Sequence, residues 1–195
     1  MTTYPYAPRS NIDGTPKPET DEEFHERVLA FLEVWDASNR LERAGRLIWV
    51  DSNLVSVDTG YWDRSETAAA MQEARSSFIQ GNFISTLVLA LAYVEHVVND
   101  ALPPPPPNKR APTMSDAIKK ARDAGLFPCD LLDEALVLYD FRNPLVHRRK
   151  ADDPDTLGER VRDRKSHPRL ILEHDARDAL LLMYAFFRYS LTQPQ

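Results

Sequence analysis

The side chains best suited to chemistry lie in the stretch Arg142-Asn143-Pro144-Leu145-Val146-His147, at the end of a Leu-rich helical pattern. An imidazole exchanges protons near neutral pH, which makes His147 a candidate general base or acid. A guanidinium is always cationic, so Arg142 would hold an anionic group. Asn143 lies between these two residues in the sequence. These residue types could form a joint site for one ligand.

The spacing of these residues needs a bend. On an unbroken helix, side chains five positions apart point about 140° away from each other, so Arg142 and His147 would not converge. Pro144 changes this expectation, because Asn143 can act as the N-cap of a new turn whose first residue is the proline. We therefore expect the helix that starts at Asp130 to be interrupted at Asn143-Pro144. The plain alternative is that both cations decorate a helix C-terminus, where the helix dipole favours them.

Three further cations, Arg148, Arg149 and Lys150, follow the motif directly. Residues 142–169 carry nine basic and five acidic side chains, whereas residues 1–141 carry 13 basic and 22 acidic ones. A polyanion such as RNA could dock on the basic stretch, with an affinity that falls as salt rises. A solvated, salt-bridged loop is the other interpretation, because acidic residues interleave with the basic ones.

Other chemistries find little support. The six glycines lack the spacing of a phosphate-binding loop, and the single cysteine, Cys129, excludes an intrachain disulfide and a cysteine-based zinc site. His174-Asp175, with His147 and Asp178, suggests a metal phosphohydrolase, but a second upstream histidine and a distal aspartate are missing. The sequence thus predicts neither a metal nor a cofactor.

The elements that must position the motif are helical. The chain has 195 residues, a net charge of −6 and 43% hydrophobic residues, which favours one packed domain with appendages. Apolar residues recur at helical spacing, and capping signals such as Thr113 with Asp116 mark helix starts. These patterns predict an all-α antiparallel bundle of five to six helices. The helices are expected from residue 21, over 65–80, over 83–102, after 113, from 130 and from about 175.

The chain is expected to have three parts. Residues 1–20 are rich in proline and predict a flexible arm, and residues 21–62 form an extension with one amphipathic helix. Over residues 46–60 a β-hairpin and a continued helix compete. Residues 63–191 form the bundle, with a basic loop at 148–168. Glu95 and His96 interrupt the most apolar helix too early for a membrane span.

The motif Arg-Asn-x-x-x-His, on the penultimate core helix of a small bundle, resembles that of the HEPN ribonuclease superfamily. The resemblance covers residues 65–189. It includes the apolar helix ending in Tyr93-Val-Glu-His96, the helix at 115–124, and a last helix that begins Asp-Ala-x-x-Ala-Leu at Asp175. Residues 1–60 lie outside it. The resemblance implies an HEPN-like fold for the bundle.

The resemblance also implies an activity, that of a metal-independent endoribonuclease. Such proteins are commonly homodimers whose paired motifs line one cleft, and they often serve as toxins or antiviral effectors, with an antitoxin or defence protein as partner. RNA carries its own nucleophile, the 2′-hydroxyl, so the expected products are a 2′,3′-cyclic phosphate and a 5′-hydroxyl. Arg142, Asn143 and His147 would be catalytic, and Arg148, Arg149 and Lys150 would bind RNA.

Three expectations complete the sequence-based hypothesis. Glu95 would support the site by orienting His147 or pairing with Arg142, unless it only marks where its helix re-emerges into solvent. The N-terminus has no basic segment followed by an apolar run, which predicts a cytoplasmic protein. A catalytically inactive dimerisation or protein-interaction module is the alternative function.

Overall fold

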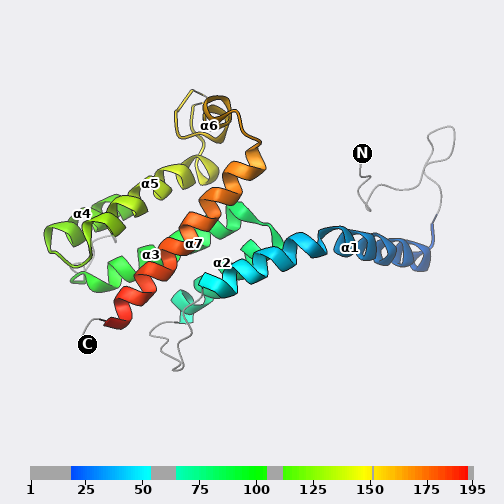
Figure 1. Cartoon of the computed structure of the whole chain (residues 1–195), viewed down its shortest axis with the longest axis horizontal. Coiled ribbons are helices and arrows are strands. Elements are labelled where there is room, and N and C mark those ends of the chain that lie inside the picture. Colours follow the sequence, from blue (N-terminus) through cyan, green and yellow to red (C-terminus); the bar gives the residue numbers. More distant parts are fainter. Residues whose placement is uncertain (1–18, 54–64, 105–111, 151, 193–195) are drawn as a thin grey trace. The chain divides into compact units, whose positions relative to one another are not determined.

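The computed structural model describes residues 19–53, 65–104, 112–150 and 152–192. Over these residues the secondary structure is helical, without strands, which confirms the all-α prediction (Figure 1). The helices are α1 (Asp21–Asn53), α2 (Ser65–Gln80), α3 (Phe83–Ala101), α4 (Met114–Asp123), α5 (Cys129–Val146), α6 (Leu157–Arg164) and α7 (Pro168–Thr192). The chain divides into two compact units, Met1–Gly45 and Arg46–Gln195. The predicted arm lies outside the described residues up to residue 18, and so does the predicted domain boundary at residue 62.

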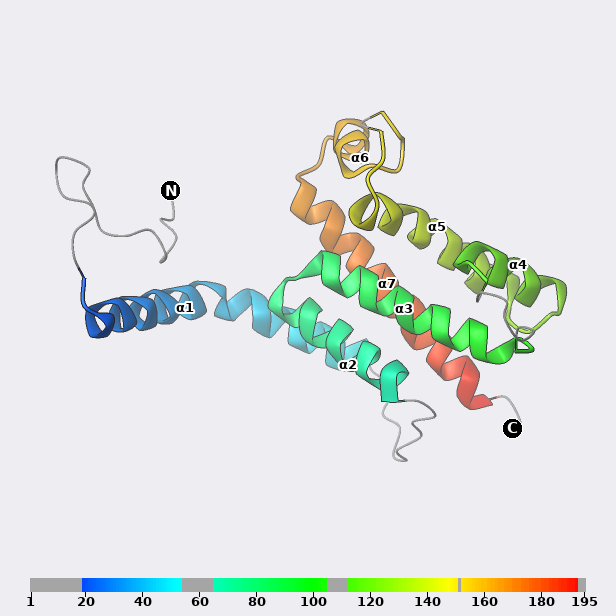
Figure 2. The same cartoon turned by 180° about the vertical axis from the view of Figure 1, so that it is seen from behind.

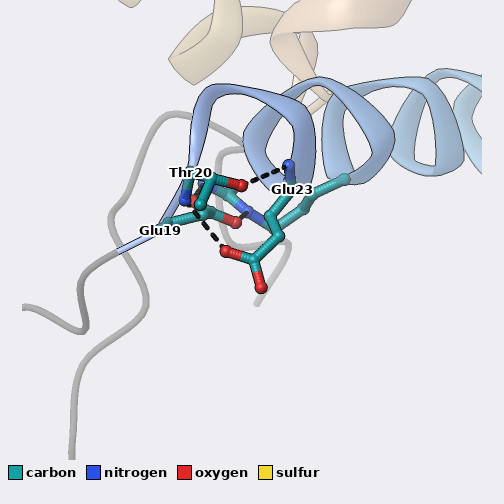
Figure 3. Close-up of polar contacts among 4 residues, drawn as sticks. Glu19, Thr20 and Glu23 are labelled. Carbon is teal, nitrogen blue, oxygen red and sulfur yellow. Dashed lines mark hydrogen bonds and ion pairs between the residues drawn. The ribbon is translucent and has the colours of Figure 1, made fainter.

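A reciprocal pair of hydrogen bonds starts α1 at the predicted residue. The backbone N–H of Glu23 donates to Oγ1 of Thr20 (3.2 Å), and the N–H of Thr20 donates to Oε2 of Glu23 (2.9 Å), as Figure 3 shows. This capping box satisfies two backbone donors that a helix start leaves unpaired. Glu19 adds an ion pair with Arg27 (2.6 Å) one turn further on. Local chemistry alone therefore fixes this helix end.

The first unit presents apolar side chains to solvent. Leu32 and Trp35 are 47% and 53% exposed, and the ring of Trp35 lies 5.9 Å from that of Phe31. These residues belong to the predicted apolar face of the first helix. Within this unit, the face is only partly covered.

In the second unit, the end of α1 packs against α2. Arg46 is buried and its Nε donates to the carbonyl of Ile79 (3.0 Å), while the rings of Trp49 and Phe78 lie 5.0 Å apart. Val50 is fully buried. Residues 46–53 therefore continue the helix, and the hairpin alternative is wrong for them because burial of one helical face outweighs β propensity. Residues 54–60 lie outside the described part.

The bundle is centred on α3, which contacts α2, α4, α5 and α7 (Figures 1 and 2). Gly81 joins α2 to α3 at φ +80°, where a side chain would be strained. By length and composition, α3 could also span a membrane, a test that core helices of soluble proteins pass as well. Here Leu87, Ala90 and Val94 are fully buried between neighbouring helices.

The helix directions depart partly from the predicted antiparallel order. α5 runs antiparallel to α7, because Phe127, just before α5, stacks on Phe186 and Tyr189 near the end of α7 (5.2 and 5.4 Å between ring centroids). In contrast, α3 and α7 run in the same direction (Figure 2). Their first turns meet where the guanidinium of Arg169 lies 5.4 Å from the ring of Phe83.

The start of α4 agrees with the prediction from its capping residues, and the start of α5 differs from the prediction by one residue. Thr113 caps α4 by accepting a hydrogen bond from the N–H of Asp116 (3.3 Å), and Gly125 after α4 has a left-handed conformation (φ +64°). The sequence predicts that the next helix starts at Asp130, whereas α5 starts one residue earlier, with Pro128 at the cap position. The exposed Cys129 is the first residue of α5.

The segment predicted as a basic loop at 148–168 is not irregular throughout. It contains α6, whose N-cap Thr156 accepts from the N–H of Glu159 (3.3 Å) and which ends at Lys165 in a left-handed conformation (φ 48°). The last helix begins at Pro168, two turns before the predicted Asp175. Proline is favoured at the first position of a helix. Leu157 and Val161 are the apolar residues of α6, and two such residues are too few to predict a helix from periodicity.

Candidate functional site

The predicted interruption of the helix at Asn143-Pro144 is absent. α5 continues through the proline to Val146, and Asn143 is an interior residue rather than an N-cap. The backbone N–H of His147 donates to the carbonyl of Asn143 (2.8 Å), which closes the last turn. Proline fits helical φ and removes only the hydrogen bond to the carbonyl of Asp140, so near a helix end the helix tolerates it.

Arg142 is half-buried near the C-terminal end of α5. Its guanidinium carbon lies 5.5 Å from the ring centroid of Tyr139, one turn earlier. Its Nε is buried and has no hydrogen-bond partner in the described part of the chain. A buried donor without a partner costs on the order of 1–3 kcal/mol, more on a charged group.

His147 is exposed and ends α5 as its C-cap. Its backbone is extended (φ −128°, ψ 135°). The angle of about 140° between side chains five positions apart holds only on a regular helix, so it does not set the direction of the His147 side chain. Among the described residues, no hydrogen bond or ion pair joins it to Arg142. The structure thus places both groups at one end of α5, one half-buried and one open to solvent.

Arg148, Arg149 and Lys150, which we name the cationic triplet, are exposed in the segment after α5. Acidic side chains also lie near the cationic triplet. Burial raises the pKa of Asp140 on α5, Asp155 and Asp153 raise it further, and Arg149 lowers it. Arg149 therefore lies among carboxylates, as the salt-bridged interpretation of this stretch expects.

One buried ion pair joins α6 to α7. Figures 1 and 2 show α6 and the start of α7 beside the end of α5. Nη1 of Arg160 lies 2.7 Å from Oδ2 of Asp175, and Nη2 lies 2.5 Å from Oδ1. The guanidinium also stacks on the ring of Phe141, 3.7 Å from its centroid. Phe141 directly precedes Arg142 in the chain, so this contact lies next to the first residue of the motif. Sequence reasoning missed it; an aspartate amid the apolar residues of the last helix was the available signal.

Glu95 lies towards the other end of the bundle. Its neighbour Tyr93 lies beside Ser190: burial raises the pKa of the tyrosine, and the serine side chain lowers it. Ser190 is fifteen residues beyond Asp175 on α7, about 22 Å of helix. Since the end of α5 lies near Asp175, Glu95 does not contact Arg142 or His147 within one chain. The expected supporting role has no geometric basis there.

The metal-phosphohydrolase alternative is not supported. Asp175 is committed to Arg160, and Nδ1 of His174 pairs with Oδ2 of Asp178 (2.9 Å). Across the residues that the structure describes, no group of three or more His, Cys, Asp or Glu side chains could hold a metal ion.

Comparisons with known proteins add no relative: no family model, no curated protein and no solved structure matches this chain. The function must therefore be argued from the site.

Proposed function

We propose that this chain is an HEPN-type, metal-independent endoribonuclease. One observation carries the proposal. At the end of α5, a half-buried guanidinium with an unpartnered donor precedes an exposed imidazole by five residues. Arg142 and His147 are the pair that RNA cleavage by its own 2′-hydroxyl needs: one group to hold the phosphate and one to move a proton.

In this mechanism, His147 accepts the proton of the 2′-hydroxyl while the 2′-oxygen attacks phosphorus. The bond from phosphorus to the 5′-oxygen breaks, and that oxygen leaves with a proton from the protonated imidazole of a second motif or from water. Arg142 holds the non-bridging oxygens. The products are a 2′,3′-cyclic phosphate and a 5′-hydroxyl. Asn143 is not used as a cap, which leaves its amide to orient the phosphate.

The cationic triplet supports RNA binding, because it is exposed and adjoins the motif. We further propose a cytoplasmic homodimer whose two motifs share one cleft, with an antitoxin or another defence protein as its partner. This arrangement would supply a second imidazole for the leaving oxygen.

The decisive experiment compares two histidine variants on total RNA in EDTA. His147→Ala should lose cleavage by at least about 100-fold, the usual contribution of a general acid or base. His25→Ala, which removes an exposed histidine of α1, should cleave like the unaltered chain. Mass spectrometry of the fragments should show cyclic phosphate ends. Dependence on a divalent metal, or equal loss in both variants, would contradict the proposal.

An inactive protein-interaction module is the second candidate, and the exposed apolar side chains of α1 favour it. It predicts RNA or protein binding without turnover by the unaltered chain.

A further inference from the structure

We propose that Arg160 is a positioning residue of the RNA site, an inference that rests on the proposed function. Its guanidinium holds in place the connecting segment, residues 147–156, which carries His147 and the cationic triplet. Three observations support the inference. They concern the contact between Phe141 and Arg160, the burial of Arg160 in α6, and the ion pair of Arg160 with Asp175.

The first observation is that α5 and α6, the helices on either side of the connecting segment, contact each other. Phe141 lies in α5 just before the connecting segment, Arg160 lies in α6 just after it, and their side chains stack at 3.7 Å. Within the described part of the segment, the N–H of Asp153 donates to the carbonyl of Lys150 (3.2 Å), and the N–H of Thr156 donates to the carbonyl of Asp153 (3.0 Å). The stacking contact therefore closes the loop that presents His147.

The second observation concerns α6. Among its eight residues, Arg160 is the buried one, and the others are exposed or half-buried. A polar helix of two turns has little apolar surface with which to attach itself. The bidentate bonds of Arg160 to Asp175 are a buried attachment of α6 to α7, beside the half-buried Leu157 and Val161.

The third observation is the chemistry of the anchor. Arg160 and Asp175 are 6% and 1% exposed, and Nε of Arg160 is buried without a partner in the described residues. Apolar residues of similar volume often stabilise a fold as well as a buried ion pair does; what the pair adds is a defined geometry. Arg160 is also too buried to reach RNA. Its role is thus to set where the segment lies.

The test uses two variants of the full chain, each of which alters one side chain that contacts Arg160; we call them the clamp variants. Phe141→Leu removes the stacked ring and keeps apolar volume, and Asp175→Asn keeps the shape of the acceptor and removes its charge. Arg122→Ala is the matched control, because it removes an exposed ion pair, with Asp133, between α4 and α5. Each variant is measured for kcat on RNA and for amide exchange along the chain.

Both clamp variants should lower kcat at saturating RNA by at least about tenfold, as expected for a displaced catalytic group. Amide exchange should rise about tenfold or more over residues 147–156 and stay unchanged in α3, which marks local rather than global opening. Arg122→Ala should change neither quantity.

Two results would overturn the inference. Unchanged kcat with faster exchange in the segment would show that its position is immaterial, and an equal rise of exchange in α3 would make Arg160 a general stabiliser. Asp175→Asn leaves a buried arginine partly unpaired and is the variant more prone to misfold, so Phe141→Leu decides if it does. Failure of the proposed function is seen separately, as absence of cleavage by the unaltered chain, and the positioning role falls with it.

Discussion

Arg142 combines two properties that an ammonium group does not have: a planar face that stacks on Tyr139 and a buried Nε donor. A lysine at this position would keep the positive charge but would lose both the stacking and the forked donor geometry.

Arg142→Lys should therefore lower RNA cleavage by about 100-fold, the scale of losing a fixed donor at a developing charge. The melting temperature should change little, because the side chain is only half-buried. Initial rates and thermal unfolding of the same sample measure the two effects. Arg122→Lys, on an exposed arginine of α4, is the control; equal rates for both variants would remove Arg142 from the mechanism.

Glu134 on α5 is the second informative residue. The side chain is exposed; the part of it that is desolvated raises its pKa, and the nearby charges of Asp178 and Asp130 raise it further. A carboxyl group whose pKa is higher in the folded chain binds its proton more tightly there. Its stabilising contribution is present below the unfolded pKa and is lost as pH rises through the folded pKa.

Glu134→Gln should consequently raise the urea midpoint at pH 7, because the charged carboxylate then opposes folding. The gain should disappear at about pH 3.5, where the glutamate is protonated in both states. Glu73→Gln, on an exposed glutamate of α2, should show no such gain. A gain that is equal at both pH values would contradict the raised pKa.

At the scale of elements, Pro144 tests the difference between the expected bend and the continuous α5. Pro144→Ala restores a backbone donor to a helix that already runs through this position. We expect the free energy of unfolding to rise by about 1 kcal/mol, less than the full interior penalty of proline because the helix ends two residues later. Chemical denaturation measures it.

Cleavage by Pro144→Ala should stay within about twofold of the unaltered chain, since no bend is lost. Val137→Ala, at an exposed position of α5, controls for a simple change of side chain. A large loss of cleavage with gained stability would show that the proline, rather than the helix end, arranges Arg142 and His147.

Elements whose ends are defined by local chemistry were predictable from the sequence. The end of α2 at Gln80 and the cap of α4 at Thr113 need no distant partner. The elements that the sequence did not predict depend on tertiary contacts. α6 is held by Arg160 with Asp175, and residues 46–53 stay helical because Trp49 packs on Phe78.

The candidate site was predictable in composition but not in geometry. Residue types and spacing singled out Arg142 and His147, and both lie at the end of a bundle helix. Spacing does not show how a helix treats an internal proline, and it misplaced the support at Glu95. Such long-range relations require the packing of α3, α5 and α7.

At the scale of the whole molecule, net charge and local charge oppose each other. The chain carries −6 overall, yet the cationic triplet adjoins the motif. The proposed RNA binding would therefore rely on a few local contacts, because the rest of the chain repels a polyanion.

The affinity of His147→Ala for single-stranded RNA should fall with salt at a log–log slope of about −2, the value for three neutralised phosphates. Replacing Arg148, Arg149 and Lys150 by alanine should bring the slope close to zero. Fluorescence anisotropy at several salt concentrations measures both. The control, alanine at Lys119 and Lys120 on α4, should keep the slope; a slope that persists without the triplet would place the contacts elsewhere.

The lone thiol at the start of α5 offers a spectroscopic handle that needs no engineering. Cys129 is exposed, and the length of α5, about 27 Å, separates it from His147, so a nitroxide attached there would leave the catalytic end untouched. Each copy would carry one spin. In a pair of copies, dipolar spectroscopy would then return a single distance distribution, and its mean would tell which ends of the two α5 helices face each other.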